Sequence, residues 1–365
     1  MKARTVKLGD LAKFLNGGTP SKEVSEYWSG TVPWISSADI AEDTIQQPRH
    51  YVTETAIQKS ATNLVPTNTL LIVTRTGVGK LAITSEPLCF SQDITAILLP
   101  DDCNISYIAR SIKSQTNTLV TQARGATIKG ITRDVIENLS IHLPPLPEQK
   151  RIAAILDKAD ELKRKREAAI AKLDQLAQSI FVEMFGHPNS RNKKFPQLKL
   201  TEFFKFKTGK LDSNAANVGG KYPFFTCSRE SFWIDEYAFD EEALLLAGNN
   251  ANADYSVKYY NGRFNAYQRT YVLNVNGENS YVYAKACLEF MLKEFKQASK
   301  GSSTKYLTMG IFDRMLIQVP PLALQEGFAD RFIKIEQLKT DNIAALTKQN
   351  NLFASLQHQA FAGHL

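Results

Sequence analysis

The sequence has few cysteines, and long apolar segments are missing. Its 365 residues include Cys89, Cys103, Cys227 and Cys287, and no two of them form a C-x-x-C pair. This spacing predicts neither a disulfide framework nor a structural zinc site. The N-terminus, MKARTVKLGDLAKF, lacks the apolar core of a signal peptide, and no run of about 18 apolar residues could cross a bilayer. We therefore expect a cytoplasmic protein with no membrane partner.

Catalytic and metal-binding motifs are missing as well. Both Pro-Pro pairs are followed by leucine, so neither belongs to the [DN]-P-P-[FYW] tetrapeptide of adenine methyltransferases. There is no H-E-x-x-H motif, and the five histidines are scattered. The segment TRTGVGK at 74–80 lacks the first glycine of a phosphate-binding loop, and Leu81 follows Lys80 where a hydroxyl would hold magnesium. These absences favour a chain with no catalytic residue, no metal and no cofactor of its own.

The composition indicates a folded protein with a basic surplus. Hydrophobic residues make up 43% of the chain, and 44 Lys and Arg outnumber 37 Asp and Glu, for a formal net charge of +7. Such a surplus favours a polyanionic partner such as nucleic acid. The length exceeds what one hydrophobic core usually serves, so two domains are expected.

The sequence contains an internal repeat. Residues 125–149 align without a gap on residues 301–325, at a constant offset of 176. The identical pairs are Gly125/Gly301, Lys129/Lys305, Thr132/Thr308, Pro144/Pro320, Pro145/Pro321, Leu146/Leu322 and Gln149/Gln325. The molecule is therefore predicted to consist of two similar halves. The stretches before the repeat match poorly, so the two halves should recognise different things.

Each half is predicted to be a mixed globular segment followed by a long helix. Strands are expected at 70–74, 94–99, 243–247 and 271–275, and helices at 107–119 and 281–296. Pro144, Pro145 and Pro147 predict an extended hinge, with the first long helix beginning at Glu148. Apolar residues then recur every three or four positions, as in a coiled coil, with Arg166 interrupting the pattern. The positions expected to pack against the other helix or a partner subunit are Ile152, Ile155, Leu162, Leu173, Leu176, Phe328, Phe332, Leu338, Leu346 and Leu356.

The expected fold class is α+β, with two mixed, β-rich domains separated by two long antiparallel coiled-coil helices in a pseudo-twofold repeat. The predicted boundaries are a first recognition domain at 1–143, a hinge and central helical spacer at 144–187, a linker at 188–196, a second recognition domain at 197–318, and a hinge with the distal helix at 319–365. Antiparallel helices would hold two DNA-reading domains a fixed distance apart.

These features together resemble the specificity subunit of type I restriction-modification systems. The resemblance rests on a mixed domain, then G-x-x-x-K-x-x-T, then LPPLPEQKRIAAILDKAD at 143–160, with the whole order repeated once. The distal copy is looser, since Ala323 and Leu324 replace Pro147 and Glu148. The resemblance implies a non-catalytic subunit that reads an asymmetric, bipartite double-stranded DNA target. It also implies two modification (methyltransferase) subunits and separate restriction subunits as partners, which would carry S-adenosylmethionine, ATP and Mg²⁺.

Candidate DNA-contacting residues lie in loops. In the first half they are Arg75, Thr76 and Lys80, although this loop could equally be a solvated turn. In the second half, Asn249, Asn250 and Asn252 are either adenine readers or simple turn formers. The other candidates are Lys129, Arg229, Tyr267, Gln268, Arg269 and Lys305. Lys129 and Lys305 occupy matching positions, which favours a shared phosphate contact over two unrelated surface lysines.

Two other functions stay open on the sequence alone. A coiled-coil adaptor with two protein-binding modules would show binding that is indifferent to DNA sequence and to salt. A cryptic nuclease would show metal-dependent cleavage by the isolated chain.

Overall fold

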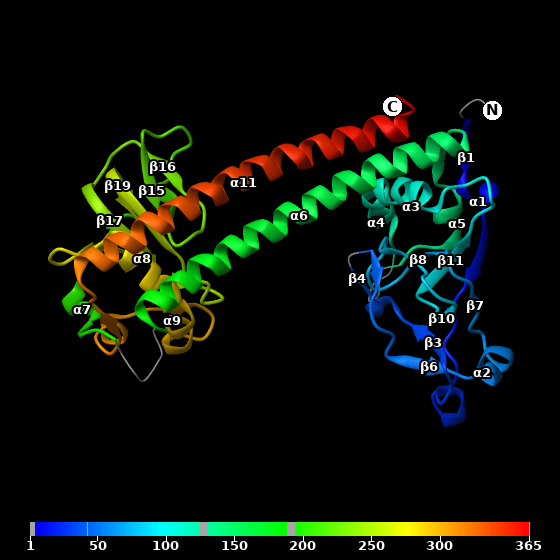
Figure 1. The fold of residues 1–365 in the computed structure, drawn as a ribbon, viewed down its shortest axis with the longest axis horizontal. Helices are drawn as coiled ribbons and strands as arrows, with labels where there is room; N and C mark the ends of the chain where they lie inside the picture. The colour runs from blue at the N-terminus through cyan, green and yellow to red at the C-terminus, as the bar shows by residue number, and fades with distance from the viewer. Residues whose placement is uncertain (1–3, 42, 125–129, 188–193, 365) are drawn as a thin grey trace. The chain divides into compact units, whose positions relative to one another are not determined.

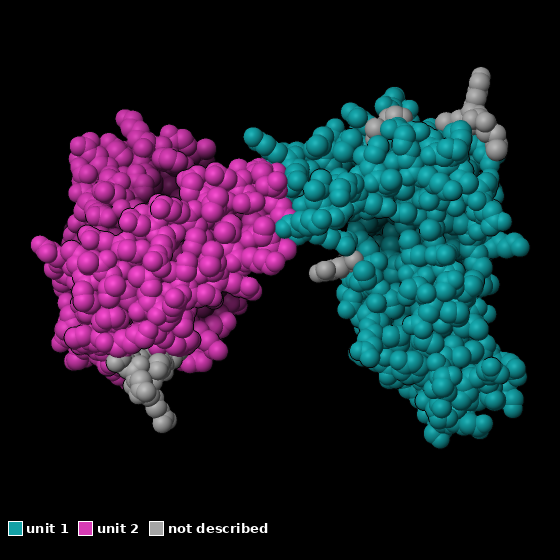
Figure 2. Space-filling model, viewed as in Figure 1, with its two compact units in different colours: residues 1–165, 346–365 teal, residues 166–345 magenta. Residues whose placement is uncertain are grey.

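The structure is a computed structural model that describes residues 4–41, 43–124, 130–187 and 194–364. The chain divides into two compact units (Figure 2). Unit 1 comprises residues 1–165 and 346–365, and unit 2 comprises residues 166–345. The division falls inside both long helices, so each unit contains part of each helix. Within the described residues, no helix is long and apolar enough to cross a membrane.

Unit 1 contains strands in two sheets with helices on one side (Figure 1). Its helices are α1 Leu8–Leu11, α2 Glu54–Lys59, α3 Ile105–Ser114, α4 Thr116–Gln122 and α5 Arg133–Glu137, with 3-10 turns at Ser25–Trp28 and Ser37–Asp39. Its strands are β1 Arg4–Lys7, β2 Lys13–Asn16, β3 Val32–Ile35, β4 Ile40–Ala41, β5 Thr44–Ile45, β6 His50–Val52, β7 Leu64–Val65, β8 Leu70–Val73, β9 Leu81–Ile83, β10 Leu88–Phe90, β11 Ile94–Leu98 and β12 Ser140–Leu143. The described strands form four-stranded sheets in the orders β6-β3-β10-β7 and β2-β11-β8-β9, with β1-β12 and β4-β5 as separate pairs.

Strand β8 shows how the core of unit 1 is built. Successive side chains of a strand point to opposite faces. Leu70 and Ile72 accordingly join the cluster that contains the helices, whereas Leu71 and Val73 join a second cluster on the other face. All four are fully buried, so β8 is a central strand covered on both sides.

Unit 2 has one larger sheet. Its helices are α7 Leu200–Phe203, α8 Tyr281–Phe290, α9 Leu292–Ala298 and α10 Met309–Phe312, with a 3-10 turn at Ser213–Ala215. Its strands are β13 Gln197–Lys199, β14 Phe204–Thr208, β15 Tyr222–Phe225, β16 Phe232–Ile234, β17 Phe239–Ala247, β18 Asn249–Asn250, β19 Val257–Ala266, β20 Thr270–Val275, β21 Lys305–Tyr306 and β22 Leu316–Gln318. The described strands order as β14-β20-β17-β19-β15-β16, with β13-β22 and β18-β21 as separate pairs.

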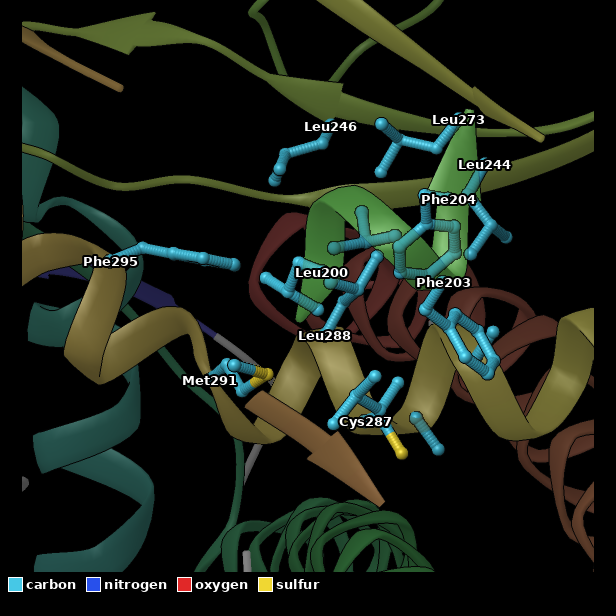
Figure 3. Packing of buried hydrophobic residues seen from close by; sticks show 14 of the residues in the cluster. Leu200, Phe203, Phe204, Leu244, Leu246, Leu273, Cys287, Leu288, Met291 and Phe295 are labelled. Atoms are coloured by element: carbon cyan, nitrogen blue, oxygen red, sulfur yellow. The ribbon is translucent and has the colours of Figure 1, made fainter. Parts of the chain in front are cut away.

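The core of unit 2 lies between this sheet and α8. Figure 3 shows Leu244, Leu246 and Leu273 pointing from the sheet toward Cys287 and Leu288 of α8. The intervening β17 residues, Ala243 and Leu245, join the cluster on the opposite face. β17 therefore alternates in the same way as β8, and the two strands are counterparts in the repeat.

The long helices are α6 Leu146–Phe185 and α11 Leu322–Ala362. They pair antiparallel, because the first part of α6 shares a core cluster with the end of α11 in unit 1, and the end of α6 shares one with the first part of α11 in unit 2. In unit 2, Arg166 Nη1 donates to Asn342 Oδ1 at 3.2 Å, and these residues lie 176 positions apart. Each is therefore bonded to its own counterpart in the repeat.

The start of α6 corrects the prediction at Pro147. The helix begins at Leu146 and includes Pro147 in its first turn, whereas the sequence suggested that it starts after this proline. The first amide groups of a helix have no intrahelical partner, so proline loses no hydrogen bond there. The extended hinge is correspondingly shorter and contains Pro144 and Pro145.

The predicted helix-packing positions divide by exposure. Ile152 and Phe328 are buried. Ile155, Leu173, Phe332, Leu346 and Leu356 are half-buried. Leu162, Leu176 and Leu338 are exposed. The buried positions on α6 also include Ala153, Leu156, Ala177, Phe181 and Phe185, which a single heptad seam did not select. The reason is that each end of α6 packs against its globular core as well as against α11, so the buried stripe is wider and shifted.

The two predicted helices of the globular parts are each broken. The segment expected at 107–119 forms α3 and α4 on either side of Gln115, and the segment expected at 281–296 forms α8 and α9 on either side of Met291. The breaks lie 176 residues apart. At the first, the Gln115 side chain donates to the carbonyls of Ser111 and Ser140, which ties the turn to β12. The break is thus part of the repeated fold.

Candidate nucleic-acid interface

Two predicted segments of unit 2 that are far apart in the sequence lie together. Asn249 and Asn250 form the short strand β18, which pairs antiparallel with Lys305 and Tyr306 of β21. The amide of Leu307 also donates to the carbonyl of Gly248 at 2.8 Å. The asparagine turn and the lysine of the repeat therefore share one edge of unit 2.

The loop before β20 joins the same edge. The amide of Gly248 donates to the carbonyl of Arg269 at 2.8 Å, and Cys227 Sγ lies 3.3 Å from that carbonyl. The side chains of Gln268 and Arg269 are exposed, and Tyr267 is half-buried. Gln268 Nε2 lies 3.4 Å from Asp212 Oδ2. Of these three candidates, Arg269 lies nearest to the asparagine turn.

Arg229 is held at this edge by an ion pair. Its guanidinium contacts the Asp254 carboxylate at 2.7 Å, and 71% of the Arg229 side chain is exposed. The hydrogen bond from Arg229 lowers the pKa of Asp254, and the reciprocal bond raises the pKa of Arg229. Lys258 Nζ donates to the carbonyls of Ser228 and Glu230, which fixes the turn that carries Arg229. A phosphate at this edge would compete with Asp254 for the guanidinium.

The asparagines of the turn have different roles. Asn250 Oδ1 accepts from the amides of Asn252 and Asp254 at 2.9 and 3.2 Å, which is a local turn-forming role. Ala253, next in the turn, has a φ of +52°. Asn252 is exposed, and Asn249 is half-buried in β18. The turn-former interpretation therefore has direct structural support at Asn250.

The loop of unit 1 connects β8 to β9. Arg75 and Thr76 are exposed, and Thr76 has a φ of +53°. Gly77 and Gly79 also have positive φ, which glycine adopts without strain. Lys80 Nζ donates to the carbonyl of Ile40 at 3.1 Å, so its ammonium group ties the loop to β4. The candidate in this loop that points to solvent with a positive charge is thus Arg75.

The loops of the two units occupy equivalent places. Arg75 bridges Gly130 in unit 1, and Asn249 pairs with Tyr306 in unit 2. Gly130 and Tyr306 are 176 residues apart. The bond from Ile131 N to Thr74 O, at 2.9 Å, likewise matches that from Leu307 N to Gly248 O. The same backbone frame therefore presents arginine in one unit and asparagine in the other.

The matching lysines are only partly described. Lys129 lies outside the described residues. Lys305 Nζ donates to the carbonyl of Gly301 at 2.6 Å, a local bond across the turn before β21. Whether either lysine contacts phosphate stays a prediction.

Sequence reasoning missed a basic pair beside these lysines. Arg124 bridges Gly130, and Lys300 bridges Tyr306, again at the offset of 176. The signal was present, because a basic residue immediately precedes each copy of the aligned segment. Tyr306, 43% exposed beside Asn249, was also missed, and the repeat gives no signal for it because its counterpart is Gly130.

The described residues contain no group of three or more His, Cys, Asp or Glu side chains that could hold a metal ion. Three of the cysteines have a raised pKa: burial raises the pKa of Cys89 and Cys103 to about 11 and that of Cys287 to about 12.

Comparison with known proteins identifies the family. The sequence matches the family described as "Type I restriction modification DNA specificity domain" over residues 2–172 and 192–351. The chain belongs to this family. The MjaIX specificity subunit of Methanocaldococcus jannaschii is 24% identical over 365 residues, covering 88% of this chain and 84% of the relative. The EcoR124I/EcoR124II specificity subunit of Escherichia coli is 33% identical over 162 residues, covering 42% of this chain and 40% of the relative.

Solved structures of type I specificity subunits share the fold. The S subunit of the M. genitalium type I restriction-modification system has a TM-score of 0.65 at 17% identity, covering 99% of this chain and 96% of that one. A second chain, from a study of complex assembly in the type I R-M system, has a TM-score of 0.60 at 17% identity, covering 100% and 98%. These matches confirm the expected architecture of mixed domains and long helices.

Proposed function

We propose that this chain is the DNA-recognition subunit of a type I restriction-modification complex, and that its two units read the two parts of an asymmetric target. The observation that carries this proposal is the equivalence of the two loop edges, which present Arg75 in one unit and Asn249 in the other. Arginine pairs with guanine and asparagine with adenine in the major groove. Equivalent frames with different side chains suit a target whose two parts differ.

The long helices are proposed to hold partner subunits. Their described surfaces expose large apolar side chains, which on a protein that acts alone would remain in contact with water. These residues are Leu162, Leu176, Leu324, Ile333, Leu338, Ile343 and Leu352. Modification subunits would cover them and supply S-adenosylmethionine and the methyltransferase site, while restriction subunits would supply the ATP- and Mg²⁺-dependent steps. This chain would contribute DNA recognition without a catalytic group.

Mapping of methylated bases tests this function directly. The gene for this chain is expressed with the partner genes of its system, and the modified positions of the host genome are determined. We expect a bipartite motif with a modified adenine on each strand and two different halves. DNA binding that ignores sequence and salt would instead favour a protein-binding adaptor, and cleavage by the isolated chain with metal alone would favour a nuclease.

An insertion tests whether the helices set the spacing of the two halves. Four residues inserted near Ala168 add about 6 Å of helix, or nearly two base pairs at about 3.4 Å each. A matched insertion near Ala344, at the equivalent position of α11, keeps the helices paired. The spacer should lengthen while both half-sequences stay the same. If the bases change and the spacing does not, the helices do not set the distance.

Thiol alkylation tests the location of the interface without a mutation. Cys227 lies beside the Arg269 carbonyl at the proposed DNA edge, whereas Cys103 lies next to Asp102, close to the start of α3. Bound DNA should slow the alkylation of Cys227 and leave the rate at Cys103 unchanged. Each thiol is compared with its own rate in the absence of DNA, measured by mass spectrometry. Equal protection of both would contradict the proposed edge.

A further inference from the structure

A buried glutamine in the first turn of α6 joins three segments of unit 1. Gln149 is 1% exposed. Its Oε1 accepts from the amide of Asn104, the residue that caps α3, at 2.8 Å. Its Nε2 donates to the carbonyl of Pro144 at 2.8 Å and to that of Asp102 at 3.3 Å. One side chain thus links the long helix, the proline turn before it and the start of the globular helix.

The same joint exists in unit 2. Gln325 is fully buried in the first turn of α11. Its Oε1 accepts from the amide of Ser280, which caps α8, at 2.9 Å. Its Nε2 donates to the carbonyl of Pro320 and to Asn279 Oδ1, both at 2.8 Å. The two glutamines are 176 residues apart, as are their capping partners and their prolines.

A tyrosine closes each joint from the other side. Tyr107 Oη in α3 donates to the carbonyl of His142 at 2.7 Å, and Tyr283 Oη in α8 donates to the carbonyl of Gln318 at 3.0 Å. The accepting residues belong to β12 and β22, the strands that lead into the proline turns. Each globular helix is therefore bonded both to the strand before the turn and to the long helix after it.

The chemistry of these contacts favours a geometric role. A hydrogen bond fixes distance and direction, whereas apolar packing at the same place would tolerate sliding and rotation. A buried amide must keep its partners, because an unsatisfied buried polar group is costly. The capping residue differs between the units, Asn104 against Ser280, and so does one acceptor of the amide group. The glutamine and its proline carbonyl are the parts that stay the same.

We propose that Gln149 and Gln325 are positioning residues that fix the angle between each DNA-reading domain and its long helix, and thereby restrict the spacer to one length. This inference rests on the proposed function. A joint that rotates would move the reading loops along the DNA without changing the side chains that face the bases. Loss of either glutamine should therefore loosen the spacing and leave both half-sequences intact.

Selection from a DNA library tests the joint. The full chain, assembled with its partner subunits, selects from duplexes with random sequence, and the bound fraction gives the half-sequences and the spacer lengths. The variants are Gln149→Met and Gln325→Met, which keep side-chain length and remove both polar groups. Wild type should select one dominant spacer. In each variant the preference for that spacer over one base pair more or less should fall about tenfold, because each loses several buried hydrogen bonds.

Milder variants guard against misfolding. Tyr107→Phe and Tyr283→Phe remove one hydroxyl from each joint and should broaden the spacer distribution in the same direction, by a smaller factor. Tyr271→Phe is the matched control, because its hydroxyl donates to the carbonyl of Leu307 at 3.1 Å, within unit 2 but away from the joint. The control should keep the wild-type distribution. If the methionine variants do not fold, the phenylalanine pair decides.

The outcomes separate this inference from the proposed function. Unchanged spacer selection in the folded joint variants would overturn the positioning role and leave DNA recognition intact. Altered half-sequences would overturn it too, because the joint would then act on base recognition. If wild type selects no bipartite motif at all, the proposed function fails and the inference fails with it.

Discussion

The central strand pairs of the two units differ at one place. In unit 2, β17 and β19 pair without interruption from Phe239–Phe264 to Leu246–Val257. In unit 1 the same pairing is split into β7 with β10 and β8 with β9. Between these two short pairs lie Pro66 and Pro87, opposite each other in the shared register.

The prolines account for the split. Proline has a fixed φ and no amide hydrogen, so it is placed at strand ends and bulges. After Pro66 the chain turns, and Asn68 takes a φ of +58°. The hydroxyls of Thr69 and Thr84 donate to the Pro66 carbonyl, which holds the turn. At the corresponding register position unit 2 has Asp240 opposite Arg263, an ion pair that a continuous ladder accommodates. One cross-strand position therefore decides between a divided sheet and a continuous one.

Core truncation gives the largest expected effect and tests this difference. Leu70→Ala in β8 and Leu244→Ala in β17 remove matched, fully buried side chains, and each should lower the free energy of unfolding by about 3 kcal/mol. Hydrogen exchange should then show lost protection across the whole sheet of unit 2. In unit 1 the loss should spare β6, β3, β10 and β7. Equal spreading in both units would show that the prolines do not separate the sheets.

Loop substitutions test the difference in recognition. Arg75→Ala should weaken binding of the full complex by about 2 kcal/mol and relax the bases of one half of the target. Asn249→Ala should relax the other half by a similar amount. The measurement is library selection with each variant, and Glu230→Ala, on the neighbouring turn, serves as an exposed control. If both substitutions relax the same half, the assignment of one half to each unit is wrong.

The buried carboxylate of unit 1 gives a smaller, pH-dependent effect. Asp39 is 3% exposed, and burial alone would raise its pKa. Hydrogen bonds from Arg49 and Ser36 outweigh burial, so the pKa lies below the ordinary value. The charged form therefore stabilises the fold above about pH 4, and this contribution is lost as the pH falls through the lowered pKa.

Asp39→Asn should accordingly lower the free energy of unfolding by about 1.5 kcal/mol near neutral pH. Denaturant titrations at several pH values measure this. The difference from wild type should shrink as the pH falls below about 4. A constant difference at all pH values would mean that the charge of Asp39 does not stabilise unit 1.

The repeat lysines give the smallest expected change. If Lys129 and Lys305 each contact one phosphate, Lys129→Ala and Lys305→Ala should each reduce the dependence of log affinity on log salt by about one. Base preference should stay the same, and the two variants should behave alike. Lys22→Ala, an exposed lysine outside both loops, should leave the slope unchanged. Different slopes for the two repeat lysines would limit the phosphate contact to one unit.

The sequence predicted the parts of the fold that depend on local pattern. The buried strands β8 and β11 and the two long helices follow from apolar runs and spacing, and the repeat correctly matched the loop after β8 with that after β17. The breaks at Gln115 and Met291 could not be predicted, because both residues favour helices and tertiary contacts make the turn. The exposed positions Leu162, Leu176 and Leu338 were indistinguishable from Ile152, since a heptad pattern does not show which side a globular core occupies.

The bond between Arg166 and Asn342 has a consequence for how the chain can change. In a dimer of two identical chains, a residue that meets its own counterpart must face a copy of itself, and arginine would then oppose arginine. A single polypeptide with two copies is free of this rule, because each copy mutates alone. Arginine can therefore face asparagine and form a hydrogen bond at 3.2 Å. The same freedom lets one recognition surface acquire a new specificity while the other keeps the old one.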